Sequence, residues 1–91
     1  MNNDVVRINT RTGFECDIDQ TRMNDMELLD NIVELENGNT LALSRVIGKL
    51  FPPSMKAALY NHVRTEDGRV PFDKLSEEIA DVFNGLKDGK K

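Results

Sequence analysis

The sequence predicts an α+β fold that is mostly α, with an N-terminal β-hairpin over residues 5–19 followed by about four helices. Two observations carry this prediction. Apolar and polar residues alternate within 5–19, which is the period of a half-buried strand. From residue 25 onward the apolar spacing changes to three and four, which is the period of an amphipathic helix. The 91 residues, of which 38% are hydrophobic, predict one small domain, 1–91, with a modest core.

The register of the hairpin follows from the length of its loop. A three-residue loop over 11–13 pairs Ile8 with Cys16 and Val6 with Ile18, so that these apolar side chains share one face. A two-residue loop would scatter them over both faces. Three-residue loops need a left-handed residue in last place, and the last loop residue here is a glycine. We therefore expect a three-residue loop and helices that cover the apolar face.

The first helix is predicted over about 25–36, with Asn24 or Asp25 as its cap and Gly38 after its end. Its apolar residues cover about half of the helix circumference, whereas one packing partner needs a stripe of roughly 100°. We therefore expect this helix to contact two neighbours. Its two apolar rows are Met26, Leu29 and Val33, and beside them Leu28, Ile32 and Leu35.

Capping residues and prolines mark three further helices. Thr40 and Ser54 are expected to cap the second and third helices, Pro52 to end the second, and Pro71 to begin the fourth. The predicted ranges are 41–51, 54–65 and 71–86, with a frayed tail over 87–91. The fourth helix is expected to bury Phe72, Leu75, Ile79, Val82, Phe83 and Leu86.

Composition favours a reducing compartment and no membrane. Cys16 is the single cysteine, so no internal disulfide can form, and the N-terminus lacks the features of a signal peptide. No apolar run approaches the roughly 20 residues that cross a bilayer. We expect a cytoplasmic protein.

Charge is unevenly distributed along the chain. The net charge is −4, but residues 15–39 carry eight acids against one base, whereas 40–64 carry four bases and no acid. The plainer interpretation is a set of solvated helix faces that complement one another. Alternatively, opposed patches guide self-association or docking of a partner. Nucleic acid is a poor candidate partner, because phosphate binding favours a basic domain.

The candidate sites for chemistry do not fit any known pattern. Residues 63–74 resemble an EF-hand in order, but with Gly68 at the sixth position Lys74 takes the place of the bidentate acid. His62 is the only histidine and is expected to be partly buried and hydrogen-bonded, and Cys16 to be a small inward-facing hydrophobe. The paired acids Glu77 and Glu78, and Asp25 and Glu27, are expected on exposed helix faces. We predict no catalytic, cofactor-binding or metal-binding residues, and no enzyme activity.

Four short segments resemble a family of tail assembly chaperones, which are encoded by long-tailed phages and prophages of Gram-positive bacteria. The segments are DMELLD (25–30), LALSRV (41–46), LYNHVRTEDGRVP (59–71) and SEEI (76–79). The resemblance covers most of the chain from Gly13 onward, including the order of hairpin then helices. It is a pattern of short blocks and contains no catalytic signature.

The resemblance implies a non-enzymatic role in virion morphogenesis within the host cytoplasm. Such a chaperone binds and solubilises the tape measure protein, assists assembly of the tail tube protein around it, and is not retained in the virion. In that family a ribosomal frameshift often gives a longer second product. Two alternatives remain open at this point: a small phage structural connector, and a DNA-associated helical module that contacts phosphate through Lys49, Lys56, Arg64 and Arg69.

The first helix supplies the predicted partner-binding surface. A protein that covers a long amphipathic helical partner needs surplus apolar surface of its own. We predict that Leu28, Ile32 and Leu35 face a partner or another copy of the chain. In the same prediction, the row formed by Met26, Leu29 and Val33 faces the core.

Overall fold

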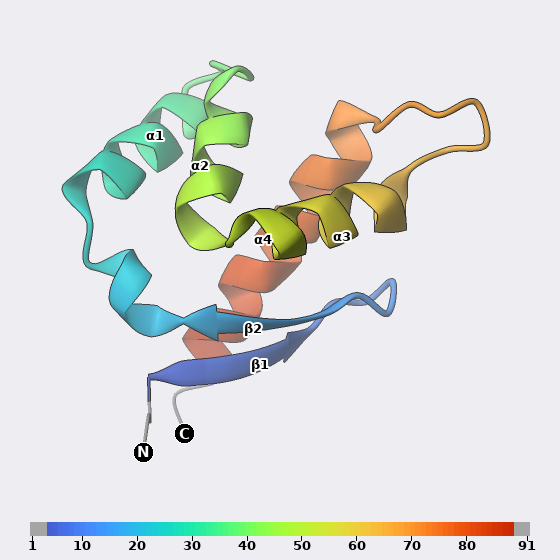
Figure 1. The fold of residues 1–91 in the computed structure, drawn as a ribbon. Helices are drawn as coiled ribbons and strands as arrows, with labels where there is room; N and C mark the ends of the chain where they lie inside the picture. The colour runs from blue at the N-terminus through green and yellow to red at the C-terminus, as the bar shows by residue number, and fades with distance from the viewer. Residues whose placement is uncertain (1–3, 89–91) are drawn as a thin grey trace.

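The alternating N-terminal segment folds back on itself as a hairpin, and four α-helices follow it (Figure 1). The structure is a computed structural model that describes residues 4–88. The predicted fold class, α+β and mostly α, is confirmed. The elements are β1 (Val5–Asn9), β2 (Glu15–Asp19), a 3₁₀ turn η1 (Gln20–Met23), α1 (Met26–Glu36), α2 (Ala42–Leu50), α3 (Pro53–Val63) and α4 (Phe72–Asp88).

The hairpin has the predicted register. Strands β1 and β2 are antiparallel, with Ile8 opposite Cys16 and Val6 opposite Ile18. Gly13 closes the three-residue loop with a φ of +94°, the left-handed conformation that glycine adopts without steric cost. Ile8, Cys16 and Ile18 are buried, whereas the alternate residues of both strands face solvent or the edge of the core.

The first helix begins as predicted. The Asp25 carboxylate is its N-cap, because Asp25 Oδ1 accepts a hydrogen bond from the backbone N–H of Glu27 at 2.9 Å. This side chain satisfies a donor that has no partner inside the helix. The short 3₁₀ turn η1 before it was not predicted, and it gives the chain its change of direction between β2 and α1.

Other helix ends differ from the prediction. Thr40 does not cap α2; Asn39 Oδ1 instead accepts from the backbone N–H of Leu41 at 3.2 Å. Ser54 does not cap α3, because the helix already begins at Pro53, whose missing N–H costs nothing in a first turn. Pro52 does separate α2 from α3 as expected.

The last two helices also differ from their predicted ranges. Helix α3 ends at Val63, two residues before its predicted end, because the chain then enters the turn around Gly68. Helix α4 continues to Asp88, so the frayed tail predicted over 87–91 is wrong at residues 87 and 88. The rest of the predicted tail, residues 89–91, lies outside the described part of the chain.

The core lies between the apolar face of the hairpin and the four helices. Helix α2 supplies much of it, α1 packs along α2, and α4 packs against β1. Phe72, which was predicted to be buried by the fourth helix, is 44% exposed because it occupies the first turn of α4, at the edge of the core. The most deeply buried large side chains are Phe51, Ile18, Leu28, Ile47, Leu50 and Leu59.

Candidate partner-binding groove

The two apolar rows of α1 are placed the opposite way round from the prediction. Leu28 is 0% exposed and belongs to the core, so it is not available to a partner in this structure. Met26 is 67% exposed, Val33 55% and Leu29 40%. The prediction that Met26, Leu29 and Val33 face the core is therefore wrong. We call these three exposed side chains the α1 ridge.

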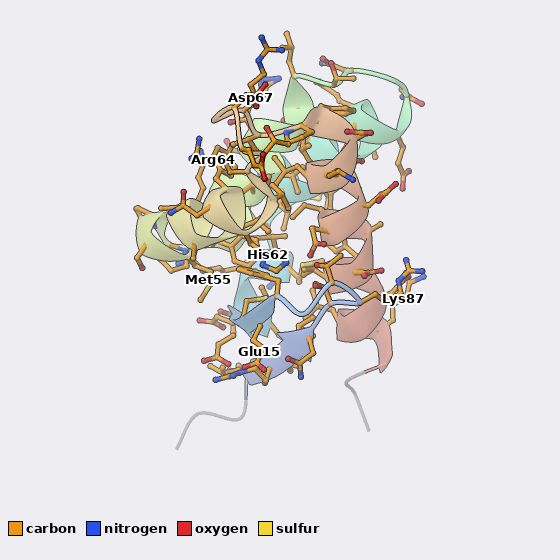
Figure 2. All side chains as sticks on the ribbon, turned by 90° about the vertical axis from the view of Figure 1, so that its right-hand side faces the viewer. Glu15, Met55, His62, Arg64, Asp67 and Lys87 are labelled. Carbon is orange, nitrogen blue, oxygen red and sulfur yellow. The ribbon has the colours of Figure 1, made fainter. Side chains whose placement is uncertain are left out.

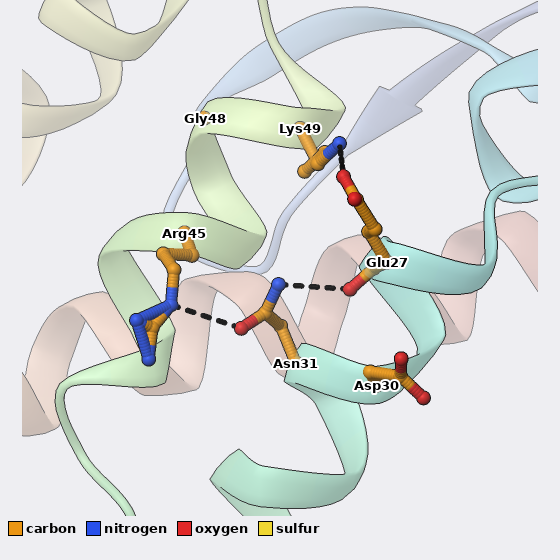
Figure 3. Close-up of a pocket in the computed structure, with 6 residues that line it drawn as sticks. All are labelled: Glu27, Asp30, Asn31, Arg45, Gly48 and Lys49. Atoms are coloured by element: carbon orange, nitrogen blue, oxygen red, sulfur yellow. Dashed lines mark hydrogen bonds and ion pairs between the residues drawn. The ribbon is translucent and has the colours of Figure 1, made fainter.

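Polar contacts with α2 fix this rotation of α1. Lys49 Nζ lies 2.8 Å from Glu27 Oε1 and 3.3 Å from Asp25 Oδ2. One turn further along, the Arg45 guanidinium donates to Asn31 Oδ1 at 3.0 Å (Figure 3). Residues four apart share one helix face, so the side of α1 that carries Glu27 and Asn31 is turned toward α2. Because apolar residues cover about half of α1, the sequence pattern alone does not determine which of them face the core.

The hollow between α1 and α2 in Figure 3 is a polar seam between the two helices. Its two cations are already engaged by side chains of α1, since Arg45 also lies 3.7 Å from Glu34. The carboxylates of Asp25 and Glu27 raise the pKa of Lys49, chiefly through its hydrogen bond with Glu27. The seam therefore holds α1 in place, and we assign it no ligand.

A more apolar groove runs between α1 and α4. It consists of two adjoining hollows of about 510 and 370 Å³, which share Ile32, Glu36, Phe83 and Asn84. Two of the three predicted partner-binding residues, Ile32 and Leu35, line this groove and are half-buried. We call it the α1–α4 groove. Its remaining lining residues are Gln20, Met23, Ser76, Ile79, Ala80, Leu86 and Lys87.

The α1 ridge lies beside the groove on the surface of α1. At about 100° per residue, Ile32, Leu29 and Val33 lie at successive angles around the helix, with Glu36 of the last turn between Ile32 and Leu29. The arc therefore begins in the groove with Leu35 and Ile32 and continues over the ridge to Met26. Such a surface fits the apolar stripe of an amphipathic helix laid alongside α1.

A second cluster joins three elements that are distant in sequence. The hydroxyl of Thr12, in the hairpin loop, donates to Glu78 Oε2 of α4 at 2.5 Å and lies 2.8 Å from Nε2 of His62 on α3. Of these three residues, His62 is labelled in Figure 2. Glu78 is only 3% exposed, so the prediction of an exposed acid is wrong for this residue. Its other oxygen, Oε1, is buried and has no hydrogen-bond partner among the described residues.

Position on α4 explains the burial of Glu78. Val82 and Leu75, four residues after and three before it, are core residues, so Glu78 lies at the border of the buried stripe. Glu77 faces away from this border and is exposed as predicted. His62 is hydrogen-bonded as expected, but it is exposed instead of partly buried, and its ring lies 5.3 Å from that of Phe14.

The hairpin loop is attached to α4 by a second contact. The Arg11 guanidinium lies 2.7 Å from Asp81 Oδ1, and the Arg11 backbone N–H donates to Asp81 Oδ2 at 3.0 Å. These contacts lower the pKa of Asp81, with the side-chain hydrogen bond from Arg11 as the largest cause. Asp81 and Glu78 are three residues apart on one face of α4, so both anchor the same loop.

The remaining residues considered as possible sites, Cys16 and the turn around Gly68, make contacts that stabilise the fold. Cys16 is 2% exposed, as predicted, and desolvation by burial raises its pKa to about 11, which keeps it in the unreactive thiol form. The turn around Gly68 is closed by a 2.8 Å bond from the Thr65 N–H to the Arg69 carbonyl, and Asp67 accepts from the Arg69 N–H. Within residues 4–88, no group of three or more metal-ligating side chains comes together.

Each of the four cations of the DNA-associated alternative has a contact within the chain. Lys49 is held by α1, and Arg64 donates to the Gly68 carbonyl at 2.8 Å. Arg69 lies 3.5 Å from Asp67, and Lys56 lies 5.6 Å from the centre of the Tyr60 ring.

Comparison with known family models, curated proteins and solved structures finds no match to this chain. None of the helices within the described range is long and apolar enough to span a bilayer. The candidate site therefore rests on its own geometry.

Proposed function

We propose that this protein is an assembly chaperone that binds an amphipathic helical segment of a larger protein along the α1–α4 groove and the α1 ridge. The sequence resemblance points to the tape measure protein of a long-tailed phage as that partner, with assistance to tail tube assembly in the host cytoplasm and release before the virion is complete. The chain is proposed to act by binding, without catalysis.

One observation carries the proposal: the half-buried groove residue Ile32 is followed around α1 by the exposed apolar side chains of Leu29, Val33 and Met26, with the carboxylate of Glu36 as the polar group between groove and ridge. A helix seated there would bury its apolar stripe against both. A long amphipathic helical protein exposes such stripes before assembly and aggregates through them. Covering them reversibly is what a chaperone must do, and side chains that are already half-buried need little reordering to do it.

A blocked groove tests the proposal. Ala80 lines the groove and is exposed, so Ala80→Glu places a charge in the groove at a helical position that tolerates glutamate. The matched control is Ala57→Glu, the same change on the exposed surface of α3. Each variant is co-expressed with the proposed tape measure partner, and soluble partner is measured after affinity capture.

We expect the wild type and Ala57→Glu to hold the partner in the soluble fraction, whereas Ala80→Glu loses it. Circular dichroism of both variants serves as the check that the fold is intact. Equal capture by the two variants would place the binding surface elsewhere. Presence of the chain in purified virions would favour the connector alternative instead.

A further inference from the structure

Asparagine is followed directly by glycine at two places in the chain, Asn37–Gly38 and Asn84–Gly85. In such a pair the backbone nitrogen of the glycine can attack the asparagine side chain, because glycine has no side chain of its own to hinder the approach. We infer that Asn37 is a site of this spontaneous modification, deamidation, in the folded protein, and that the fold protects Asn84.

The reaction needs water and no enzyme. The Gly38 nitrogen bonds to Cγ of Asn37, its proton leaves with the side-chain NH₂ group as ammonia, and a five-membered succinimide ring forms. Water then opens one of the two ring bonds between nitrogen and carbonyl carbon, which leaves aspartate or isoaspartate at position 37. The net change replaces NH₂ by OH and adds one negative charge at neutral pH.

The first pair lies at an open helix end. Asn37 is the C-cap of α1, and both it and Gly38 are exposed. A Cβ placed on Gly38 would meet no atom within 4 Å. The Gly38 N–H donates to the Leu35 carbonyl at 3.1 Å, and the Asn39 N–H donates to the Glu34 carbonyl at 2.9 Å, which is the Schellman arrangement. These bonds close a helix end, where local opening costs little free energy, so the nitrogen is released without unfolding of the domain.

The second pair lies within α4, where the backbone N–H of each residue bonds to the carbonyl four residues earlier. A Cβ at Gly85 would lie 2.9 Å from Cδ1 of the buried Ile8, so β1 packs directly on this glycine. The Gly85 nitrogen therefore reaches the Asn84 side chain only when α4 opens and separates from the hairpin. Such an opening breaks part of the core and is rarer than the opening of a helix end.

Deamidation at Asn37 has a consequence for the α1–α4 groove. The new charge falls at the negative end of the α1 dipole and beside the exposed acids Glu34 and Glu36, so it destabilises the last turn of α1. Isoaspartate also lengthens the main chain by one methylene and disrupts the hydrogen bonds of the cap. Leu35 and Glu36 in this turn line the groove, so we expect weaker binding by the modified chain. This consequence rests on the proposed function, whereas the modification does not.

Mass spectrometry of the ageing protein tests the inference. The full chain is incubated in mildly alkaline buffer, and samples are digested with a protease that works at acidic pH, where the reaction is slow. We expect the peptide containing Asn37 to gain one mass unit and to separate into aspartate and isoaspartate forms, about tenfold or more faster than the peptide containing Asn84 changes. In urea the two sites should react at similar rates, because the fold no longer distinguishes them.

Matched variants assign the reaction to one residue. Glutamine has one more methylene and does not form the five-membered ring, so Asn37→Gln should remove most of the modification of the folded chain. Asn84→Gln should leave it unchanged. Equal rates at the two sites in the folded chain, or no gain of mass at Asn37 under conditions where the urea-unfolded chain reacts, would overturn the inference.

Binding of a synthetic amphipathic helical peptide to fresh and aged chain, followed by fluorescence anisotropy, measures the consequence for the groove. We expect the aged wild type to bind more weakly than the fresh wild type, and Asn37→Gln to bind equally well before and after ageing. Unchanged binding by the aged wild type would overturn the consequence for the groove. Failure of the fresh chain to bind would overturn the proposed function and leave the modification of Asn37 standing.

Discussion

Two adjacent leucines on α1 have different roles. Leu28 is fully enclosed, whereas Leu29 is 40% exposed on the ridge. Removing a buried leucine side chain loses its transfer free energy and leaves a cavity, whereas an exposed side chain leaves neither.

We expect Leu28→Ala to lower the free energy of unfolding by about 2–5 kcal/mol, and Leu29→Ala by less than about 1 kcal/mol. Urea denaturation of the two variants measures both values. A larger loss for Leu29→Ala would show that the rotation of α1 described above is wrong.

The Thr12 hydroxyl is the only group in its cluster that contacts both His62 and Glu78. Thr12→Val keeps the shape of the side chain and leaves the buried Glu78 carboxylate without its donor, so we expect a loss of about 1–3 kcal/mol. Thr12→Ser keeps the hydroxyl and serves as the control. Equal stability of the two variants would mean that the hydroxyl does not stabilise the buried carboxylate.

Sequence reasoning could not find this cluster. An acid at the border of an apolar stripe is most often exposed, and nothing near Glu78 in sequence indicates that a hairpin loop 66 residues away supplies a hydroxyl. One weak signal in the sequence indicates that another element packs against this face of α4. Gly85 lies seven residues after Glu78 on the same face, and a glycine within a helix is typical of a place where another element approaches closely.

At the scale of elements, α4 and the hairpin meet where Gly85 faces Ile8. A Cβ at position 85 would lie 2.9 Å from Ile8 Cδ1 and 3.0 Å from Ile8 Cγ2. Ile8 is 3% exposed, so its side chain has little room to move. By contrast, a Cβ at Gly48 of α2 would meet no atom within 4 Å.

The two glycines should therefore respond in opposite directions to the same substitution. Gly48→Ala should stabilise the protein by about 0.5–1 kcal/mol, because alanine restricts the unfolded chain. Gly85→Ala should destabilise it by about 1–3 kcal/mol through overpacking. Thermal unfolding measures both changes, and a stabilising Gly85→Ala would contradict the close packing of α4 on β1.

The contact between Arg11 and Asp81 predicts a pH dependence. Because the pKa of Asp81 is lower in the folded protein than in the unfolded chain, this contact stabilises the fold above the unfolded value of about 3.9. That stabilisation is lost as the pH falls through the folded pKa. Asp81→Asn should therefore be less stable than the wild type near pH 6, and the difference should shrink as the pH falls below the unfolded value of about 3.9. A stability difference between Asp81→Asn and the wild type that does not change with pH would contradict the stabilising role of the Arg11–Asp81 contact.

Local rules succeeded at some positions and failed at others. Loop length and strand alternation predicted the hairpin register, and Asp25 was one of two predicted caps of α1, whereas the caps predicted at Thr40 and Ser54 were wrong. The rotation of α1 was predicted wrongly, since it depends on Lys49 and Arg45, which lie on another helix. Periodicity shows that a helix has an apolar face, but partners distant in sequence decide which part of a broad face is buried.

At the scale of the molecule, apolar surface remains after the core is complete. The α1 ridge and the α1–α4 groove lie together on one side, while Leu41 and Phe72 are exposed beside a smaller cleft near the start of α4. The prediction that α1 contacts two neighbours is confirmed for α2; toward α4 the two helices line a groove. We propose that the partner occupies it.

Mapping of backbone amide chemical shifts during titration with a synthetic amphipathic helical peptide of about 18 residues, or five turns of helix, tests this claim most directly. We expect the largest changes along α1 and in the groove-lining part of α4, around Ile32, Ala80 and Phe83, with little change in β1, β2 and α3. Changes concentrated at Leu41, Tyr60 and Phe72, or no saturable change at any amide, would contradict the assignment of the α1–α4 groove as the binding surface.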